Sequence, residues 1–365
     1  MLSSSVICFA QGFANATFSN GEGSARKAPP LSSSSEEGQG QFALKQVEFL
    51  IFYKFCAVNL AFFRFMYYNI KDRLFLKGVD AVVYRAKRTS EYMALSLFVG
   101  VIILFLQSFT VTEALIPNEY LRKICSILFS VFRLGAPAMI FIHMQKGSKA
   151  EPIRLRKSEQ TSVRYNVTLA FAGFAFIFIF GMLYSAAFPS AASSFTDKTW
   201  LSALLTVLGS CALPALLEEY LYRKLFCTEL TLHGSAFAVI ISALLFALAH
   251  FSFYTFPYAF ICGLALGFVY LKTGSVRYTV AMHFANNFLG FFFAFLSTKM
   301  APLDYANMMM LVIIALGVML LGALYTLLPN TKTPYAEENG NIASSVFLTF
   351  PMVVYIFCAV LMNFI

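Results

Sequence analysis

Residues 166–188 read NVTLAFAGFAFIFIFGMLYSAAF and contain no charged side chain. At about 1.5 Å per residue, such a run forms a helix long enough to cross the roughly 30 Å hydrocarbon core of a bilayer. The whole chain of 365 residues has the same character, because 59% of it is hydrophobic and only 12% is charged. A soluble domain carries about 25% charged residues. The sequence therefore predicts an all-α fold, a polytopic transmembrane helix bundle.

Similar apolar runs lie on both sides of this segment. We expect eight spans in one continuous bundle over residues 92–327, and residues 328–365 to add a polar linker and one appended C-terminal span. The predicted spans are 92–110, 124–143, 166–188, 200–217, 236–252, 257–271, 278–297, 306–327 and 345–364.

The N-terminal quarter of the chain has a different composition. Residues 1–45 are rich in serine, glycine and asparagine and cannot bury a core, so we predict a disordered polar segment. Residues 46–91 are aromatic but interrupted by basic residues too often for a span. They suit helices at the bilayer surface, or a cytoplasmic helical extension packed on the bundle.

The net charge of +9 comes from basic residues between the apolar runs. This placement is typical of loops beside anionic lipid, so we expect membrane lipid as a partner and no nucleic acid. The loop 144–165 is the most basic, whereas the loops 111–120, 189–199 and 298–305 together hold four acidic residues and only two lysines. The positive-inside rule then predicts a multi-pass protein with a cytoplasmic N-terminus and a C-terminus on the opposite side.

Within residues 166–327, charged residues enter an apolar run at one place. Residues 204–226 read LLTVLGSCALPALLEEYLYRKLF, and a charge at bilayer depth costs about 2.5–3.5 kcal/mol. Glu219 and Arg223 are four residues apart and can pair on one helix face. Glu218 lies about 100° around the helix and is left without such a partner. Either Glu218 belongs to a functional site, or these charges mark the cytoplasmic end of a span.

Two histidines also lie in apolar runs. His250 ends the run SALLFALAH, four residues after Phe246, whose ring can pack against the imidazole. His283 precedes Asn287 by four residues in VRYTVAMHFANNF, so both side chains share a helix face. We interpret Asn286, one residue off that face, as structural.

Several membrane hydrolase signatures are missing from the sequence. It contains no HExxH zinc-protease motif, no GxGD motif and no GxSxG nucleophile elbow.

The ordered set EExxxR (218–223), FxxxH (246–250) and HxxxN (283–287) resembles the CPBP family of intramembrane proteases. This family, also called Abi, contains CAAX-processing enzymes of the Ras and a-factor converting type and bacteriocin-processing relatives. The resemblance is close over 166–297 and implies an intramembrane endopeptidase for CAAX-type or bacteriocin or leader-type processing.

Carried over by motif position, the resemblance implies five catalytic residues and two supporting ones. The catalytic positions are Glu218, Glu219, His250, His283 and Asn287, and the supporting positions are Arg223 and Phe246.

The implied roles form a hydrolytic mechanism. Glu218 would be the general base that activates water, and His250 would help to hold that water. His283 and Asn287 would stabilise the oxyanion, while Glu219 would orient the base through its ion pair. A carboxylate in a low-dielectric site suits the first role, because it takes up a proton more readily than in water.

The sequence does not decide whether a metal is used, and it leaves two alternative functions open. We assign no cofactor, and zinc bound by Glu218, His250 and His283 is the alternative. A non-catalytic immunity or regulatory protein that binds a peptide in the same cavity is a second function, and a proton-coupled transporter is a third. The expected partner is a peptide or protein substrate, with a prenylated protein among the candidates.

Overall fold

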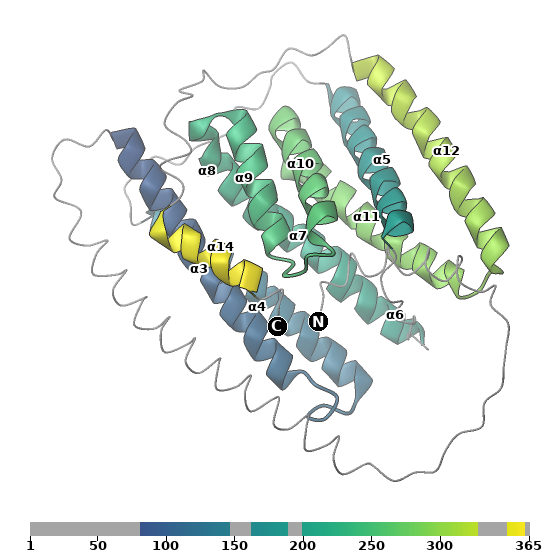
Figure 1. The fold of residues 1–365 in the computed structure, drawn as a ribbon, viewed down its shortest axis with the longest axis horizontal. Coiled ribbons are helices and arrows are strands. Elements are labelled where there is room, and N and C mark those ends of the chain that lie inside the picture. The colour runs from purple at the N-terminus through teal and green to yellow at the C-terminus, as the bar shows by residue number, and fades with distance from the viewer. Residues whose placement is uncertain (1–80, 147–161, 189–198, 328–348, 362–365) are drawn as a thin grey trace. The chain divides into compact units, whose positions relative to one another are not determined.

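The computed structural model describes residues 81–146, 162–188, 199–327 and 349–361, and every regular element in these ranges is a helix (Figure 1). Seven helical segments there are long and apolar enough to cross a membrane. The predicted class, an all-α polytopic bundle, is confirmed. The seven segments are Lys87–Thr110, Glu119–Lys146, Val163–Ala187, Trp200–His233, Phe256–Thr273, Val276–Ser297 and Pro302–Leu327.

The elements follow one another with short connections. In chain order they are α3 (Ala81–Thr110), α4 (Glu119–Lys146), α5 (Val163–Ala187), α6 (Trp200–Val207), η2 (Leu208–Ala212), α7 (Leu213–Glu218), η3 (Glu219–Cys227), α8 (Thr228–Leu230), η4 (Thr231–His233), α9 (Ser235–Leu248), α10 (Phe256–Thr273), α11 (Val276–Ser297), α12 (Pro302–Leu327) and α14 (Phe350–Leu361).

The segment from α6 to η4 is one continuous helical path that carries the two adjacent glutamates. The predicted span 200–217 does not end at these glutamates, because the helix continues to His233. Two stretches of it, η2 and η3, are π-helical. Pro214 follows η2 and has no N–H for the carbonyl one turn earlier, so a wider turn there relieves the clash.

Helix α9 differs from the predicted span 236–252. It ends at Leu248 and has 14 residues, about 21 Å, which is shorter than the hydrocarbon core. His250 therefore lies in a turn directly after a short helix, and the chain returns through α10.

The short α9 packs closely against α10. A Cβ on Gly263 would come within 2.9 Å of the Ala243 backbone, and one on Gly267 within 3.2 Å of Val239. Only glycine permits this approach at Gly263. The GxxxG of α10 is thus an internal packing face of the bundle.

Helix α5 supports the other side of the site. It packs against α10, α11 and α12, and Gly173 leaves room for Met282 and Val269 of the neighbouring helices. Ser162 caps its first turn, because its hydroxyl accepts from the Tyr165 N–H at 3.2 Å.

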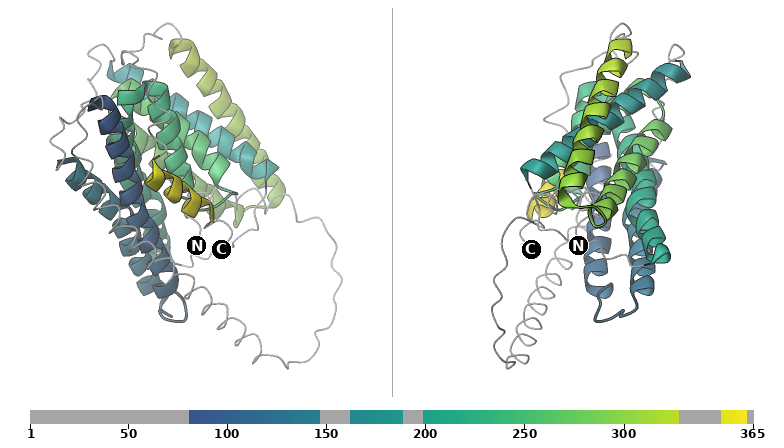
Figure 2. Two further views of the ribbon diagram at one scale, coloured as in Figure 1. Left: turned by 60° about the vertical axis from the view of Figure 1, so that its left-hand side comes forward. Right: turned by 90° about the vertical axis from the view of Figure 1, so that its right-hand side faces the viewer.

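The terminal segments are described only in part. The predicted polar segment 1–45, most of 46–91 and the linker before 349 lie outside the described residues. α3 begins at Ala81, so the first predicted span is preceded by helix. α14, drawn in yellow in Figure 2, contacts α9. The ring of its Tyr355 also meets the Phe98 ring of α3 edge-on, with 5.8 Å between the ring centres.

Candidate active site

The residues of the three motifs come together from separate helices. Glu218 ends α7 and Glu219 begins η3, His250 follows α9, and His283 and Asn287 lie on α11. All five side chains are buried. The chain thus gathers its scattered buried acids, imidazoles and amide in one region of the bundle.

Arg223 is held on three sides. Its Nε lies 3.3 Å from Glu219 Oε2, and both side chains are fully buried. Its Nη2 donates to the Gly263 carbonyl at 3.4 Å, and its guanidinium carbon lies 4.5 Å from the centre of the Phe246 ring. The ion pair predicted from the i, i+4 spacing is present, and the contact of the same guanidinium with Phe246 joins the first motif to the second.

Glu219 also holds His283. Its Oε1 accepts from His283 Nδ1 at 3.0 Å, and a carboxylate without a proton can only accept, so Nδ1 carries the hydrogen. This contact fixes the tautomer and orientation of the neutral ring. His283 Nε2 then faces Glu218 Oε2 at 3.9 Å, which is too long for a hydrogen bond.

Glu218 is a buried carboxylate whose hydrogen-bonding capacity is not fully used. Among the described residues its Oε2 has no hydrogen-bond partner, and its side chain is only 5% exposed. Its charge also acts on His250. The helix continues past Glu218 to His233, so Glu218 lies within a helical segment and not at its end. It is a carboxylate aimed at two imidazoles.

His250 has a defined orientation as well. Its Nδ1 lies 2.9 Å from the Phe246 carbonyl, which can only accept, so Nε2 of the neutral ring is left as an acceptor. The Phe246 ring packs edge-on against His250 at 4.9 Å and against His283 at 5.7 Å. The Phe246 ring therefore contacts both imidazoles, and its contact with His250 is the one that the spacing predicted.

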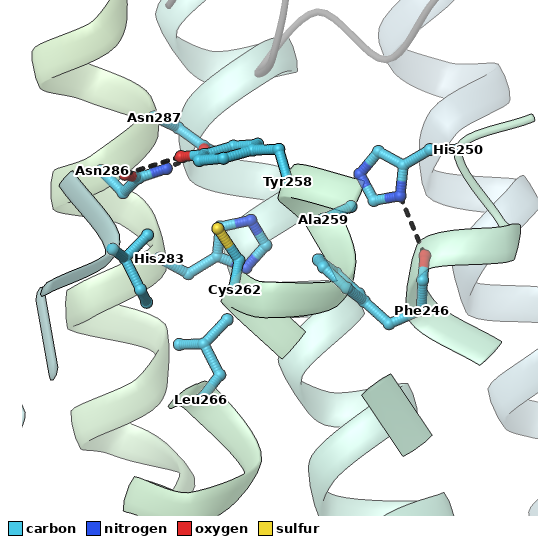
Figure 3. A pocket seen from close by; sticks show the side chains of 10 residues that line it. Phe246, His250, Tyr258, Ala259, Cys262, Leu266, His283, Asn286 and Asn287 are labelled. Atoms are coloured by element: carbon cyan, nitrogen blue, oxygen red, sulfur yellow. Dashed lines mark hydrogen bonds between the residues drawn. The ribbon is translucent and has the colours of Figure 1, made fainter. Parts of the chain in front are cut away.

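Asn286 and Tyr258 belong to the site, although the sequence pattern left Asn286 as a structural residue. The Tyr258 hydroxyl donates to Asn286 Oδ1 at 3.0 Å, and Asn286 Nδ2 donates to Asn287 Oδ1 at 3.4 Å (Figure 3). Asn287 is thereby turned so that its Nδ2 is free, and this buried donor has no partner among the described residues. The chain of contacts presents one amide N–H group for a ligand.

A small cavity lies between these side chains. Its volume is about 20 Å³, which is enough for one water molecule. His250, His283, Asn286 and Asn287 provide its polar lining, and the rest is apolar, as Figure 3 shows. Glu218 does not line this cavity, but its Oε2 lies 3.9 Å from Nε2 of His283, which does. The site can hold a water between two imidazoles and an amide.

The zinc alternative does not fit this arrangement. In the described ranges, no group of three or more histidine, cysteine, aspartate or glutamate side chains is placed to hold a metal ion. Glu218, His250 and His283 therefore do not form a ligand set, and we derive no step through zinc.

The apolar helix bundle thus holds a buried cluster of two glutamates, two histidines and an asparagine. Comparison with known proteins indicates a protease: a model of the "Type II CAAX prenyl endopeptidase Rce1-like" family matches residues 199–289. The membrane-embedded CAAX protease MroQ of Staphylococcus aureus is 26% identical over 184 residues, which cover 46% of this chain and 73% of MroQ. No solved structure gives a significant match.

The matched residues 199–289 contain all three motifs, EExxxR, FxxxH and HxxxN. Both matches support a protease of the CPBP family, and they support proteolytic activity within the membrane in general.

Proposed function

We propose that the protein is an intramembrane endopeptidase that hydrolyses a peptide bond with a water activated by Glu218. The observation that carries this proposal is the buried, unpartnered Glu218 carboxylate beside two oriented imidazoles. Burial of a carboxylate oxygen without a hydrogen-bond partner is costly, so a buried carboxylate of this kind points to a function.

The proposed reaction gives each of these groups a role. The attacking water lies between His250 Nε2 and the Glu218 carboxylate, not inside the small cavity that Glu218 does not line, and it gives a proton to Glu218 as its oxygen attacks the scissile carbonyl carbon. The oxyanion accepts from Asn287 Nδ2, and His283 adds a second donor at Nε2 when its ring carries both protons. Glu218 then returns the proton to the leaving amine. A preorganised donor at the oxyanion is typically worth about 3–4 kcal/mol.

The proposed substrate is a peptide or protein segment in contact with the membrane, with a prenylated CAAX-type C-terminus as the first candidate. The names of the matching family and of MroQ support this class.

We expect the detergent-purified protein to cleave a farnesylated CAAX peptide, and to cleave it equally well after dialysis against a chelator. Mass spectrometry of the products locates the cut. An unprenylated leader peptide is the parallel substrate for leader-type processing. Absence of cleavage with both peptides, combined with tight binding of either one, would favour the non-catalytic binding protein, and loss of activity with chelator would restore the zinc alternative.

We also propose that the end of the bundle with the loop 147–161 faces the cytoplasm, because that loop is rich in basic residues. Single cysteines placed in this loop and in the loop 298–301 should react with a membrane-impermeant reagent from opposite sides. Labelling of 147–161 from outside intact cells would contradict this orientation.

A further inference from the structure

Arg133 is a charged residue in the middle of α4, about 20 Å from either end of this membrane-crossing helix. Its side chain is far too short to reach the membrane surface from there. An arginine at this depth costs about 2.5–3.5 kcal/mol on insertion scales and is normally paired. Arg133 therefore requires a polar partner within the membrane.

The structure provides no such partner within the described ranges. The guanidinium of Arg133 forms no hydrogen bond and no ion pair with another described residue. The side chain is partly exposed, unlike the fully buried Arg223, whose charge Glu219 neutralises. A molecule outside the chain can therefore reach Arg133.

Arg133 lies on the face of α4 that packs toward the catalytic helix. Arg133, Pro137 and Phe141 are four residues apart and form one stripe, of which Pro137 and Phe141 are buried. Phe141 packs edge-on against Phe226 of η3 at 5.0 Å. The stripe thus runs along the segment that carries the two glutamates.

The charge of Arg133 is close enough to the site to act on its residues. It interacts electrostatically with the buried His250 and with Tyr222, whose ring packs against Phe246 at 5.5 Å. Arg133 is therefore a partly accessible cation beside the proposed water site, contributed by a helix outside the three motifs.

We propose that Arg133 binds the C-terminal carboxylate of the peptide substrate. This inference rests on the proposed function and adds a recognition residue to it. A planar guanidinium binds a carboxylate through two parallel hydrogen bonds, and such a pair is strong where water is excluded. A peptide end that enters the site brings a carboxylate to this depth, whereas lipid phosphates lie about 15 Å from the bilayer centre.

The test compares two forms of one substrate. A farnesylated CAAX peptide is prepared with a free C-terminal carboxylate and as the C-terminal amide, and an unprenylated pair is prepared in the same way. We expect the wild-type protein to favour the free acid by tenfold or more in kcat/KM. Arg133→Gln should lower cleavage of the acid to the level of the amide and leave the amide unchanged, and Arg133→Lys should retain part of the preference.

Arg122→Gln is the matched control, because it removes the same charge near the start of the same helix and should not change the ratio of acid to amide. An equal loss for acid and amide in Arg133→Gln would overturn the proposal in favour of a structural or purely electrostatic role. Unchanged cleavage of both would overturn it as well. An equal loss that appears only in phosphatidylglycerol vesicles, and not in phosphatidylcholine vesicles, would overturn the proposal and assign Arg133 to an anionic lipid headgroup.

A binding measurement separates this proposal from the proposed function. Fluorescence anisotropy with the four labelled peptides needs no turnover. One outcome is that no peptide is cleaved, yet the wild-type protein binds the acid tenfold more tightly than the amide and the Arg133→Gln protein does not. This outcome would support the carboxylate site and contradict the protease mechanism. If none of the peptides binds, the carboxylate site is overturned.

Discussion

Replacing Glu218 by glutamine is expected to lower the rate of peptide cleavage by about 10²–10⁴-fold, which is the usual contribution of a general base. Glutamine keeps the shape of the side chain but cannot take a proton from water. Because Glu218 Oε2 has no hydrogen-bond partner among the described residues, the substitution breaks no contact there. The protein should therefore fold and melt as the wild type does.

The measurement is a detergent-solubilised cleavage assay run beside a thermal-shift assay. Glu113→Gln, an exposed glutamate outside the bundle core, is the control for loss of one negative charge. Full cleavage by the Glu218→Gln protein would exclude the general-base role. A fall in activity that parallels a fall in thermal stability would assign Glu218 to the fold instead.

The sequence predicted the parts of the site that depend on spacing along one helix. Glu219 and Arg223, and Phe246 and His250, are four residues apart, and both contacts are present. Such pairs follow from helical geometry alone. The overall class was equally predictable, because composition and apolar run length determine whether a chain crosses a membrane.

Features that depend on packing between helices were not predictable in this way. Helix α9 ends at Leu248, before the turn that carries His250, and an apolar run does not show where a helix ends inside protein. The role of Asn286 depends on Tyr258, which is 28 residues away and on another helix. The π-helical turns of η2 and η3 were also missed, although Pro214 was a signal for one of them.

Arg133 is a residue whose role the sequence motifs alone do not predict. Its place inside the apolar run 124–143 was visible in the sequence, and its depth alone marks it as unusual. What the sequence could not show is that α4 packs beside the segment of the two glutamates. The role of a charged residue outside the motifs can be inferred only from the residues that surround it in the structure.

Removing either partner of the buried Glu219–Arg223 pair is expected to destabilise the fold by about 3–5 kcal/mol, because the remaining charge is left unpaired in a low-dielectric interior. Arg223→Ala should lower the melting temperature strongly, since this guanidinium also contacts Gly263 and Phe246. Glu219→Gln should lower it too, and should in addition release the His283 ring that Glu219 holds.

The double variant Glu219→Gln with Arg223→Met distinguishes this pairing from simple loss of packing. With both charges gone, no unpaired charge remains, so the double variant should be more stable than the sum of the single changes predicts. Thermal unfolding in detergent measures all the variants, with Lys299→Gln at the bundle surface as the control. Strictly additive losses would show that the pair does not act as a unit. Cleavage should stay low even where stability recovers, because a glutamine at 219 no longer provides the anionic acceptor that orients His283 toward Glu218.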